Sequence, residues 1–165
     1  MAREVTVAAI QSSYGDDMAA NIAKTEGFVR DAAAKGAQVI LPSELFQGPY
    51  FCVAQEERWF AHAYPWREHP AVTALAPVAE ELGVVIPVSI YEREGPHYFN
   101  SVVMLDADGK PLGVYRKSHI PDGPAIWRST TSGPATPASR SGRPASAGWA
   151  SASAGTSGTP RPPAP

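Results

Sequence analysis

Short apolar runs alternate with helix-like spacing along the first part of the chain. Val5–Ile10, Gln38–Leu41 and Val84–Ile90 are apolar runs of the length typical of buried strands. Between the first two runs, apolar residues recur at helical spacing and predict a helix from about Met18 to Lys35. Gly36 follows it, in the position where a glycine commonly ends a helix.

A second helix is predicted by apolar residues three or four positions apart, namely Val72, Leu75, Ala79 and Leu82. Pro77 falls inside this pattern and predicts a kink or a late helix start. Further along, Tyr98–Leu105 and Leu112–Arg116 flank Asp106–Gly109, which predicts a hairpin with a glycine in the turn. The order of strands and helices predicts an α/β layered fold.

The composition changes abruptly at Ala125. Of the 41 residues from 125 to 165, 34 are Ala, Gly, Pro, Ser or Thr, and no helical or strand period is present. Such a segment buries too little apolar surface to offset its chain entropy, so we expect it to be disordered. The sequence therefore divides into residues 1–124, which form the ordered part, and a low-complexity tail at residues 125–165. One explanation of residues 125–165 is a natural low-complexity tail, because such tails have this composition.

Charge and cysteine content exclude several classes of protein. The net charge is −2 and gives no reason to expect a nucleic-acid partner, although all 16 acidic residues precede position 125. One cysteine, Cys52, cannot form an internal disulfide, which favours a reducing compartment. We find no signal peptide and no apolar run of membrane-spanning length. We therefore expect a cytoplasmic protein with no membrane association.

Two charged residues come directly after predicted strands. Glu44 follows the strand Gln38–Leu41, and Lys117 follows the strand Leu112–Arg116. Functional side chains of open α/β sheets gather at the carboxyl ends of strands, so we expect both residues to face a common crevice. An arbitrary Glu or Lys in a loop is more often a solvated charge than a functional residue. The amino-acid sequence around Glu44 and Lys117 decides between these two interpretations.

Four segments resemble successive blocks of the nitrilase superfamily of carbon-nitrogen hydrolases: VTVAAIQ, LPSELFQGPYFC, ELGVVIPVSIYE and HYFNSVVMLDADGKPLGVYRKSHIPDGP. Within that superfamily they are most similar to the N-carbamoylputrescine amidases, and the resemblance covers nearly all of residues 5–124 in order. It implies the N-terminal part of an α-β-β-α sandwich whose catalytic set is a Glu, a Lys and a Cys. On this basis Glu44 is the general base and Lys117 is the catalytic lysine.

The implied reaction fits these residue types. A carboxylate can take the proton of a thiol whose ordinary pKa is about 8.5, and a lysine ammonium can stabilise the tetrahedral oxyanion. The resemblance implies that the substrate is a small carbamoyl amine or amide. It further implies a linear ureido substrate, which is cleaved to ammonia, carbon dioxide and an amine. It also implies no cofactor and a homo-oligomer for the intact family member. The four histidines have no metal-ligand spacing.

Two further residues are weaker candidates for the substrate pocket. Tyr50 and His119 flank the two catalytic blocks, and a packing or hydrogen-bonding role is equally compatible with each. Trp59, Trp66 and His69 are interpreted as surface or packing residues without a functional role.

The nucleophile of the family is missing from this chain. Cys52 lies inside ELFQGPYFC, whereas the family's cysteine follows the lysine block, so Cys52 is interpreted as a packed or pocket-lining thiol. When the codons are read one base earlier, residues 148–165 permit a string containing GICWDQWYPE, with the cysteine codon across Ser153 and Ala154. Residues 126–137 permit the block that precedes it in the family. We hypothesise that the tail is an out-of-frame translation and that the chain as written is inactive.

Two alternatives remain open on the sequence alone. The first is another enzyme of the superfamily, such as a β-ureidopropionase or an aliphatic amidase, because much of the pocket lies outside the matched blocks. The second is a non-enzymatic binding module with a flexible Ala/Ser/Pro tail. The nucleotide sequence around codon 125 distinguishes the binding module from the two enzymes.

Overall fold

The computed structural model describes residues 4–50 and 56–118. His119, Cys52 and residues 125–165 lie outside the described residues. The prediction that residues 125–165 are disordered concerns residues that the structure does not describe. In chain order the elements are β1 (Val7–Ala9), α1 (Met18–Ala34), β2 (Val39–Leu41), the 3-10 helix η2 (Glu57–His62), α2 (Pro70–Leu82), β3 (Ile86–Glu94), β4 (His97–Leu105) and β5 (Pro111–Arg116).

The strands form one layer in the order β1-β2-β3-β4-β5. β1 pairs with β2 in parallel, and β3, β4 and β5 form an antiparallel sheet. A parallel bridge between Val39 and Val85 joins the two parts, and the Ile40 and Val85 amides each donate a 2.9 Å hydrogen bond across it. β1, β2, β3 and β5 therefore point in the same direction, and their carboxyl ends lie at the same edge.

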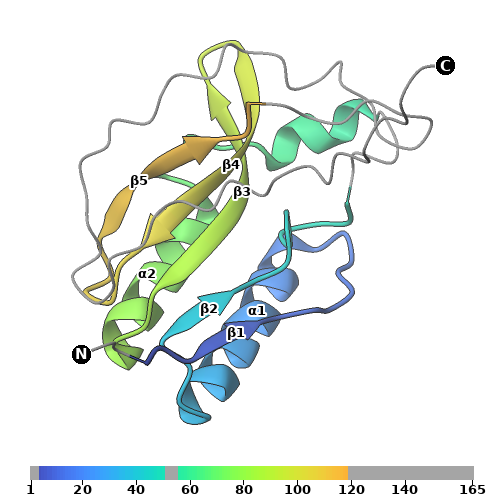
Figure 1. The fold of residues 1–165 in the computed structure, drawn as a ribbon. Helices are drawn as coiled ribbons and strands as arrows, with labels where there is room; N and C mark the ends of the chain where they lie inside the picture. The colour runs from blue at the N-terminus through green and yellow to red at the C-terminus, as the bar shows by residue number, and fades with distance from the viewer. Residues whose placement is uncertain (1–3, 51–55, 119–165) are drawn as a thin grey trace, which may run out of the picture.

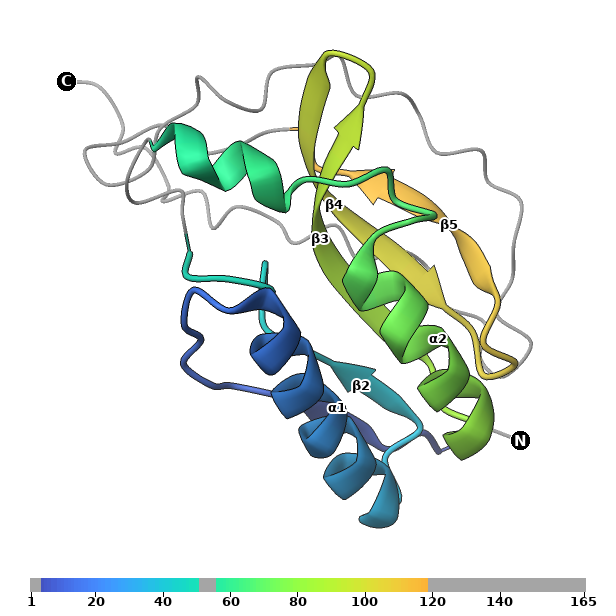
Figure 2. The same cartoon turned by 180° about the vertical axis from the view of Figure 1, so that it is seen from behind.

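Both α-helices cover the same face of this layer (Figures 1 and 2). Side chains from α1, α2 and the strands form one continuous core, whose fully buried members include Val29, Ile40, Leu75, Val88 and Val103. Val88 on β3 and Val103 on β4 are paired and lie on the same face of the sheet. Because side chains alternate along a strand, every second residue of β3 and β4 lies on this face, which packs against α2. The α/β layered fold predicted from the sequence is confirmed.

The helix ends follow from local sequence. The Asp17 side chain accepts a 3.1 Å hydrogen bond from the Ala20 amide at the start of α1, and Gly36 adopts a φ of 90° just after its end. α2 begins after His69, whose Nδ1 accepts a 3.2 Å hydrogen bond from the Ala71 amide. These caps explain why the predicted boundaries of α1 were accurate to within a residue.

The late start considered for α2 is wrong. α2 begins at Pro70, seven residues before Pro77, and runs through Pro77 to Leu82. A proline at the first helical position is favourable, and the apolar face of α2 packs into the core on both sides of Pro77. Tertiary packing thus outweighs the cost of the missing amide hydrogen bond.

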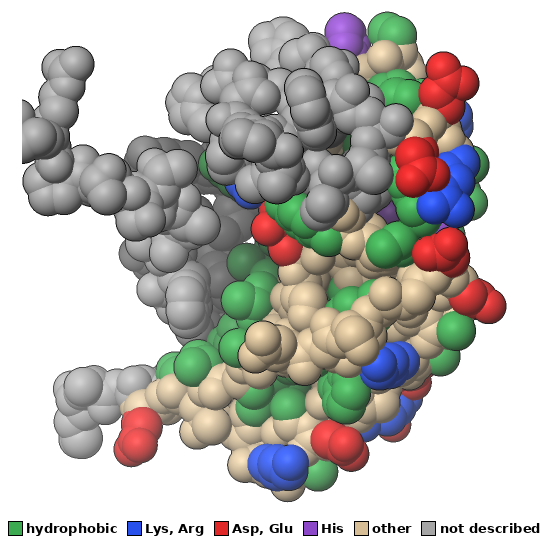
Figure 3. Space-filling model, turned by 90° about the vertical axis from the view of Figure 1, so that its right-hand side faces the viewer, with side chains coloured by type: hydrophobic (Ala, Val, Ile, Leu, Met, Phe, Trp, Pro, Cys, Tyr) green, Lys and Arg blue, Asp and Glu red, His purple; other side chains and the backbone are tan. Residues whose placement is uncertain are grey.

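The face of the sheet opposite the helices carries apolar side chains at the surface. Val7 on β1, Leu41 on β2 and Tyr115 on β5 are 60%, 48% and 46% exposed. Pairing places Val7 and Leu41 on the face opposite Ile40, which is fully buried under the helices. Figure 3 views the molecule from the side, at 90° to Figure 1, and shows hydrophobic side chains among polar ones on that part of the surface. One helical layer on a sheet with an apolar outer face is the arrangement expected of half an α-β-β-α sandwich.

Candidate active site

Glu44 and Lys117 lie together at the edge of the sheet where β2 and β5 end. Glu44 is three residues beyond the end of β2, and Lys117 is the first residue after β5. Lys117 Nζ donates a 3.0 Å hydrogen bond to Glu44 Oε1, and the two groups form a salt bridge. The side chain of Glu44 is 43% exposed and that of Lys117 is 33% exposed, so solvent reaches the pair. The shared direction of the two strands brings these distant residues into contact.

A strained turn aims Glu44 toward the sheet. The next residue, Leu45, has a φ of 52°, a left-handed conformation that costs energy for a side chain of this size. Leu45 is 2% exposed, and its amide donates a 3.1 Å hydrogen bond to Ser89 Oγ on β3. Gln47 Nε2 donates a 2.5 Å hydrogen bond to the Ser89 carbonyl. Burial and these hydrogen bonds hold the turn in place, so the position of Glu44 is fixed by its neighbours.

Lys117 is held by the end of β5 and by the residue before it. Its backbone amide donates a 2.9 Å hydrogen bond to the carbonyl of Asn100 on β4. Arg116 points to the other face, where its Nε and Nη2 form 2.9 Å and 2.7 Å hydrogen bonds with the two oxygens of Glu92. The hydrogen bond with Glu92 raises the pKa of Arg116 and keeps that guanidinium charged. The paired Arg116 therefore anchors the strand end that carries Lys117.

Asn100 is the third member of the cluster, and it was missed in the sequence analysis. Its Nδ2 donates a 2.6 Å hydrogen bond to Glu44 Oε1, and the residue is 7% exposed. Asn100 lies inside the predicted strand Tyr98–Leu105, where the polar pair Asn100 and Ser101 in an otherwise apolar segment was the available signal. Its side chain is on the face of β4 opposite Val103, because three positions separate them.

The remaining sequence candidates are placed as follows. Tyr50 lies in the loop after Glu44 and is 39% exposed. Trp59 is 6% exposed and His69 is fully buried. Of the two roles predicted for them, surface or packing, both residues therefore have the packing role. Burial lowers the pKa of His69 to about 4, with a smaller contribution from His62. A neutral His69 caps α2 and plays no part in the cluster.

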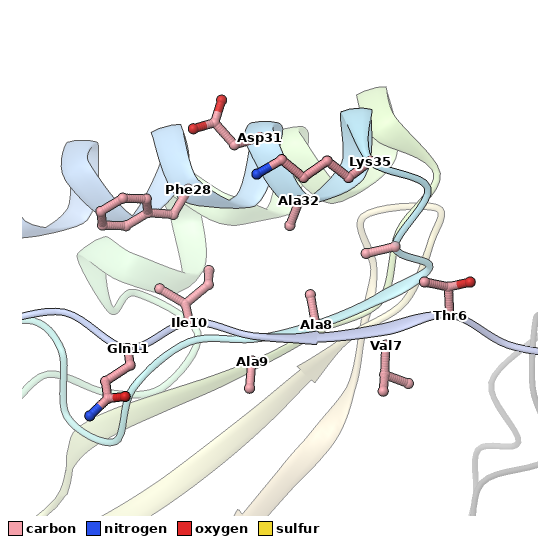
Figure 4. Close-up of a pocket in the computed structure, with 11 residues that line it drawn as sticks. Thr6, Val7, Ala8, Ala9, Ile10, Gln11, Phe28, Asp31, Ala32 and Lys35 are labelled. Atoms are coloured by element: carbon pink, nitrogen blue, oxygen red, sulfur yellow. The ribbon is translucent and has the colours of Figure 1, made fainter.

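A groove beside β1 is separate from this cluster (Figure 4). It is lined on one side by Thr6–Gln11 and on the other by Phe28 and Asp31 of α1 and by Lys35, which directly follows that helix. Neither Glu44 nor Lys117 lines it. Within residues 4–50 and 56–118 no cluster of three or more metal-ligating side chains occurs. In the same two ranges, no helix combines the length and the apolar character that crossing a bilayer requires.

A carboxylate and an ammonium just beyond the carboxyl ends of β2 and β5, joined by a side-chain amide from β4, define the class of site. The Glu44 carboxylate can accept a proton, and the Asn100 amide and the Lys117 ammonium can hold that carboxylate in one orientation. The sequence profile of carbon-nitrogen hydrolases matches residues 6–155. The chain therefore belongs to the carbon-nitrogen hydrolase family.

Individual relatives agree with this family. N-carbamoylputrescine amidases from Arabidopsis thaliana and Solanum tuberosum are 52% and 53% identical over 122 residues, which are 74% of this chain and 41% of each relative. A citrullinase from Francisella tularensis is 43% identical over 119 residues, 72% of this chain and 42% of that protein. The chain thus spans about two-fifths of the length of these relatives.

Solved structures share the fold. A carbon-nitrogen hydrolase from Helicobacter pylori G27 superposes with a TM-score of 0.72 at 26% identity, over 80% of this chain and 45% of that one. A double mutant of the amidase from Nesterenkonia sp. AN1, in complex with acrylamide, has a TM-score of 0.65 at 20% identity, over 80% and 48% of the two chains. The second likeness concerns the fold alone.

Proposed function

We propose that this chain supplies two catalytic residues of an enzyme that hydrolyses N-carbamoylputrescine to putrescine, carbon dioxide and ammonia, a step of polyamine biosynthesis. The observation that carries the proposal is the 3.0 Å contact between Glu44 and Lys117 where two strands of common direction end. The 52–53% identity to N-carbamoylputrescine amidases supports this substrate class over others in the family.

In this proposal Glu44 is the general base and Lys117 stabilises the oxyanion. The carboxylate takes the proton of a cysteine thiol, and the thiolate attacks the ureido carbonyl carbon. Lys117 faces the carbonyl oxygen as it becomes negatively charged. Glu44 then returns the proton to the departing ammonia, and water releases the remaining carbamoyl group as carbon dioxide and the amine. The chemistry uses no metal or organic cofactor.

The nucleophile is supplied by the other reading frame of the tail. Residues 1–124 are the N-terminal part of the hydrolase domain, and residues 125–165 are the out-of-frame product of a single lost base near codon 125. The 165-residue chain, which lacks the nucleophile, does not hydrolyse the substrate. We define the restored protein as the product of the same gene with one base inserted near codon 125, and we expect it to be a cytoplasmic homo-oligomer.

Two experiments test this proposal. Sequencing the gene around codon 125 is expected to show a second frame that continues through a cysteine motif. Ammonia release is then measured for the restored protein and the 165-residue chain, with N-carbamoylputrescine, citrulline and N-carbamoyl-β-alanine as substrates. We expect turnover by the restored protein alone, fastest with N-carbamoylputrescine. Ammonia release by the 165-residue chain would overturn the frame argument, and a preference for another substrate would overturn the substrate assignment.

A further inference from the structure

Asn100 contacts both members of the Glu44–Lys117 pair. Its side-chain Nδ2 donates the 2.6 Å hydrogen bond to Glu44 Oε1, and its backbone carbonyl accepts the 2.9 Å hydrogen bond from the Lys117 amide. The two partners are separated from each other by 73 positions in the sequence. A single residue near the start of β4 thus fixes the relative position of a loop carboxylate and a strand-end lysine.

The surroundings of Asn100 keep its amide in this orientation. Asn100 pairs with Tyr91 on β3, and its backbone carbonyl is bonded to the residue after β5, so its main chain is tied on both sides. The side chain is almost fully buried, and a buried amide without a partner is costly. A carboxylate oxygen can only accept, so the NH2 group must face Glu44. Burial therefore directs the amide toward the carboxylate.

The two oxygens of Glu44 have different surroundings. Oε1 accepts hydrogen bonds from Asn100 Nδ2 and Lys117 Nζ, at 2.6 Å and 3.0 Å. Among residues 4–50 and 56–118, no donor is bonded to Oε2. Because two donors compete with a proton at Oε1, a transferred proton is better accommodated at Oε2.

We infer that Asn100 is a positioning residue that occupies Oε1 of Glu44 and leaves Oε2 as the oxygen that exchanges the catalytic proton. This inference rests on the proposed function of Glu44. In the first step the thiol S–H bond breaks, its electron pair stays on sulfur, and an O–H bond forms at Oε2. In the later step the O–H bond breaks, and the proton moves to the nitrogen of the departing ammonia.

The adjacent residue provides a matched control. Ser101 Oγ also donates a 2.6 Å hydrogen bond to a buried carboxylate, Glu92 Oε2, but on the opposite face of β4. Replacing Ser101 with Ala removes the same kind of interaction one position away. It removes no hydrogen bond of Glu44 or Lys117, and Arg116, which anchors the strand end before Lys117, keeps both of its own donors to Glu92. A general effect of damaging β4 would act through both substitutions, whereas positioning of Glu44 would act through Asn100 alone.

The test compares three variants of the restored protein: Asn100→Ala, Asn100→Asp and Ser101→Ala. We expect Asn100→Ala to lower kcat about tenfold to hundredfold with little change in KM, because a misplaced catalytic group slows the chemical step. Asn100→Asp places a second carboxylate beside Glu44, so the acid limb of the kcat profile is expected to move to higher pH. Ser101→Ala is expected to keep kcat and the profile. Equal losses in Asn100→Ala and Ser101→Ala, or an unchanged profile in Asn100→Asp, would overturn the inference.

A second readout does not depend on turnover. The rate at which iodoacetamide alkylates the restored cysteine reports thiolate formation, and mass spectrometry of peptides separates that cysteine from Cys52. We expect alkylation at neutral pH to be about tenfold slower in Asn100→Ala and unchanged in Ser101→Ala. If no ureido substrate is hydrolysed but this pattern is found, the substrate proposal fails and the positioning role stands. If alkylation is the same in both variants, the positioning role fails whatever the substrate.

Discussion

Glu44 and Lys117, which are 73 positions apart in the sequence, meet through a 3.0 Å hydrogen bond between Oε1 and Nζ. The pair is partly exposed, and an ion pair of this kind contributes at most about 1 kcal/mol to stability. The strained backbone at Leu45, which aims Glu44 at the sheet, costs energy of the same order. A stabilising role therefore does not account for the arrangement, which supports the catalytic roles proposed for the two residues.

The buried pair of Arg116 and Glu92 is expected to matter far more for stability than exposed pairs. Glu92 is 1% exposed, so Arg116→Met leaves a buried carboxylate without its cationic partner and with the Ser101 hydroxyl as a neutral donor. We expect a loss of about 3–5 kcal/mol in the free energy of unfolding, measured by urea denaturation. The control is Glu81→Gln, which breaks the exposed pair with Arg30 and is expected to cost less than about 1 kcal/mol. Equal losses in the two variants would contradict the structure.

Gly109 is expected to be sensitive to substitution for two reasons. Its φ is 74°, and a Cβ at this position would lie 2.7 Å from the carbonyl oxygen of Ala76 on α2. We expect Gly109→Ala to destabilise the fold by about 2–4 kcal/mol, through backbone strain and displacement of the hairpin from α2. Gly95 has a φ of 56° and open space around it, so Gly95→Ala is expected to cost only about 1 kcal/mol. Thermal unfolding of both variants checks this order, and a reversed order would refute the packing of the turn.

His69 is expected to make stability depend on pH. The imidazole takes up a proton near pH 6.5 in the unfolded chain, whereas burial lowers its pKa to about 4 in the folded chain. Between these values the unfolded state binds more protons, so stability falls as the pH decreases from about 6.5 to 4, by at most about 3 kcal/mol. The effect is absent above this window and complete below it.

The variant His69→Asn isolates this contribution. Asn retains an acceptor for the α2 cap and does not titrate, so urea denaturation of the variant is expected to show a flatter pH dependence between 6.5 and 4. His97→Asn, at an exposed histidine, is expected to keep the dependence of the parent chain. A parent-like dependence in His69→Asn would show that His69 is not the group responsible.

The sequence predicted most elements of the fold because their local signals agree with their tertiary surroundings. α1 has its cap and terminal glycine where the pattern placed them, and the Asp106–Gly109 turn joins two strands as predicted. Glu57–His62 forms a 3-10 helix that no periodic pattern announced. β3 extends to Glu94, beyond the apolar run, because Glu92 and Glu94 pair with Arg116. Such long-range compensation of charge cannot be inferred from a local pattern.

The candidate site was predicted in part for a comparable reason. Glu44 and Lys117 follow strands of common direction, and the rule for carboxyl ends was sufficient to expect them together. Asn100 enters the cluster from β4, which runs in the opposite direction, so the same rule does not reach it. Its role depends on strand register, which the sequence does not specify.

Substitution of Glu44 in the restored protein tests the central claim most directly. Glu44→Gln keeps the shape of the side chain and removes its basicity, and ammonia release from N-carbamoylputrescine is measured alongside circular dichroism to verify folding. We predict that the restored protein turns over the substrate and that folded Glu44→Gln loses at least about a hundredfold in kcat. A folded Glu44→Gln variant that releases ammonia at the parent rate would contradict the assignment of Glu44 as the base.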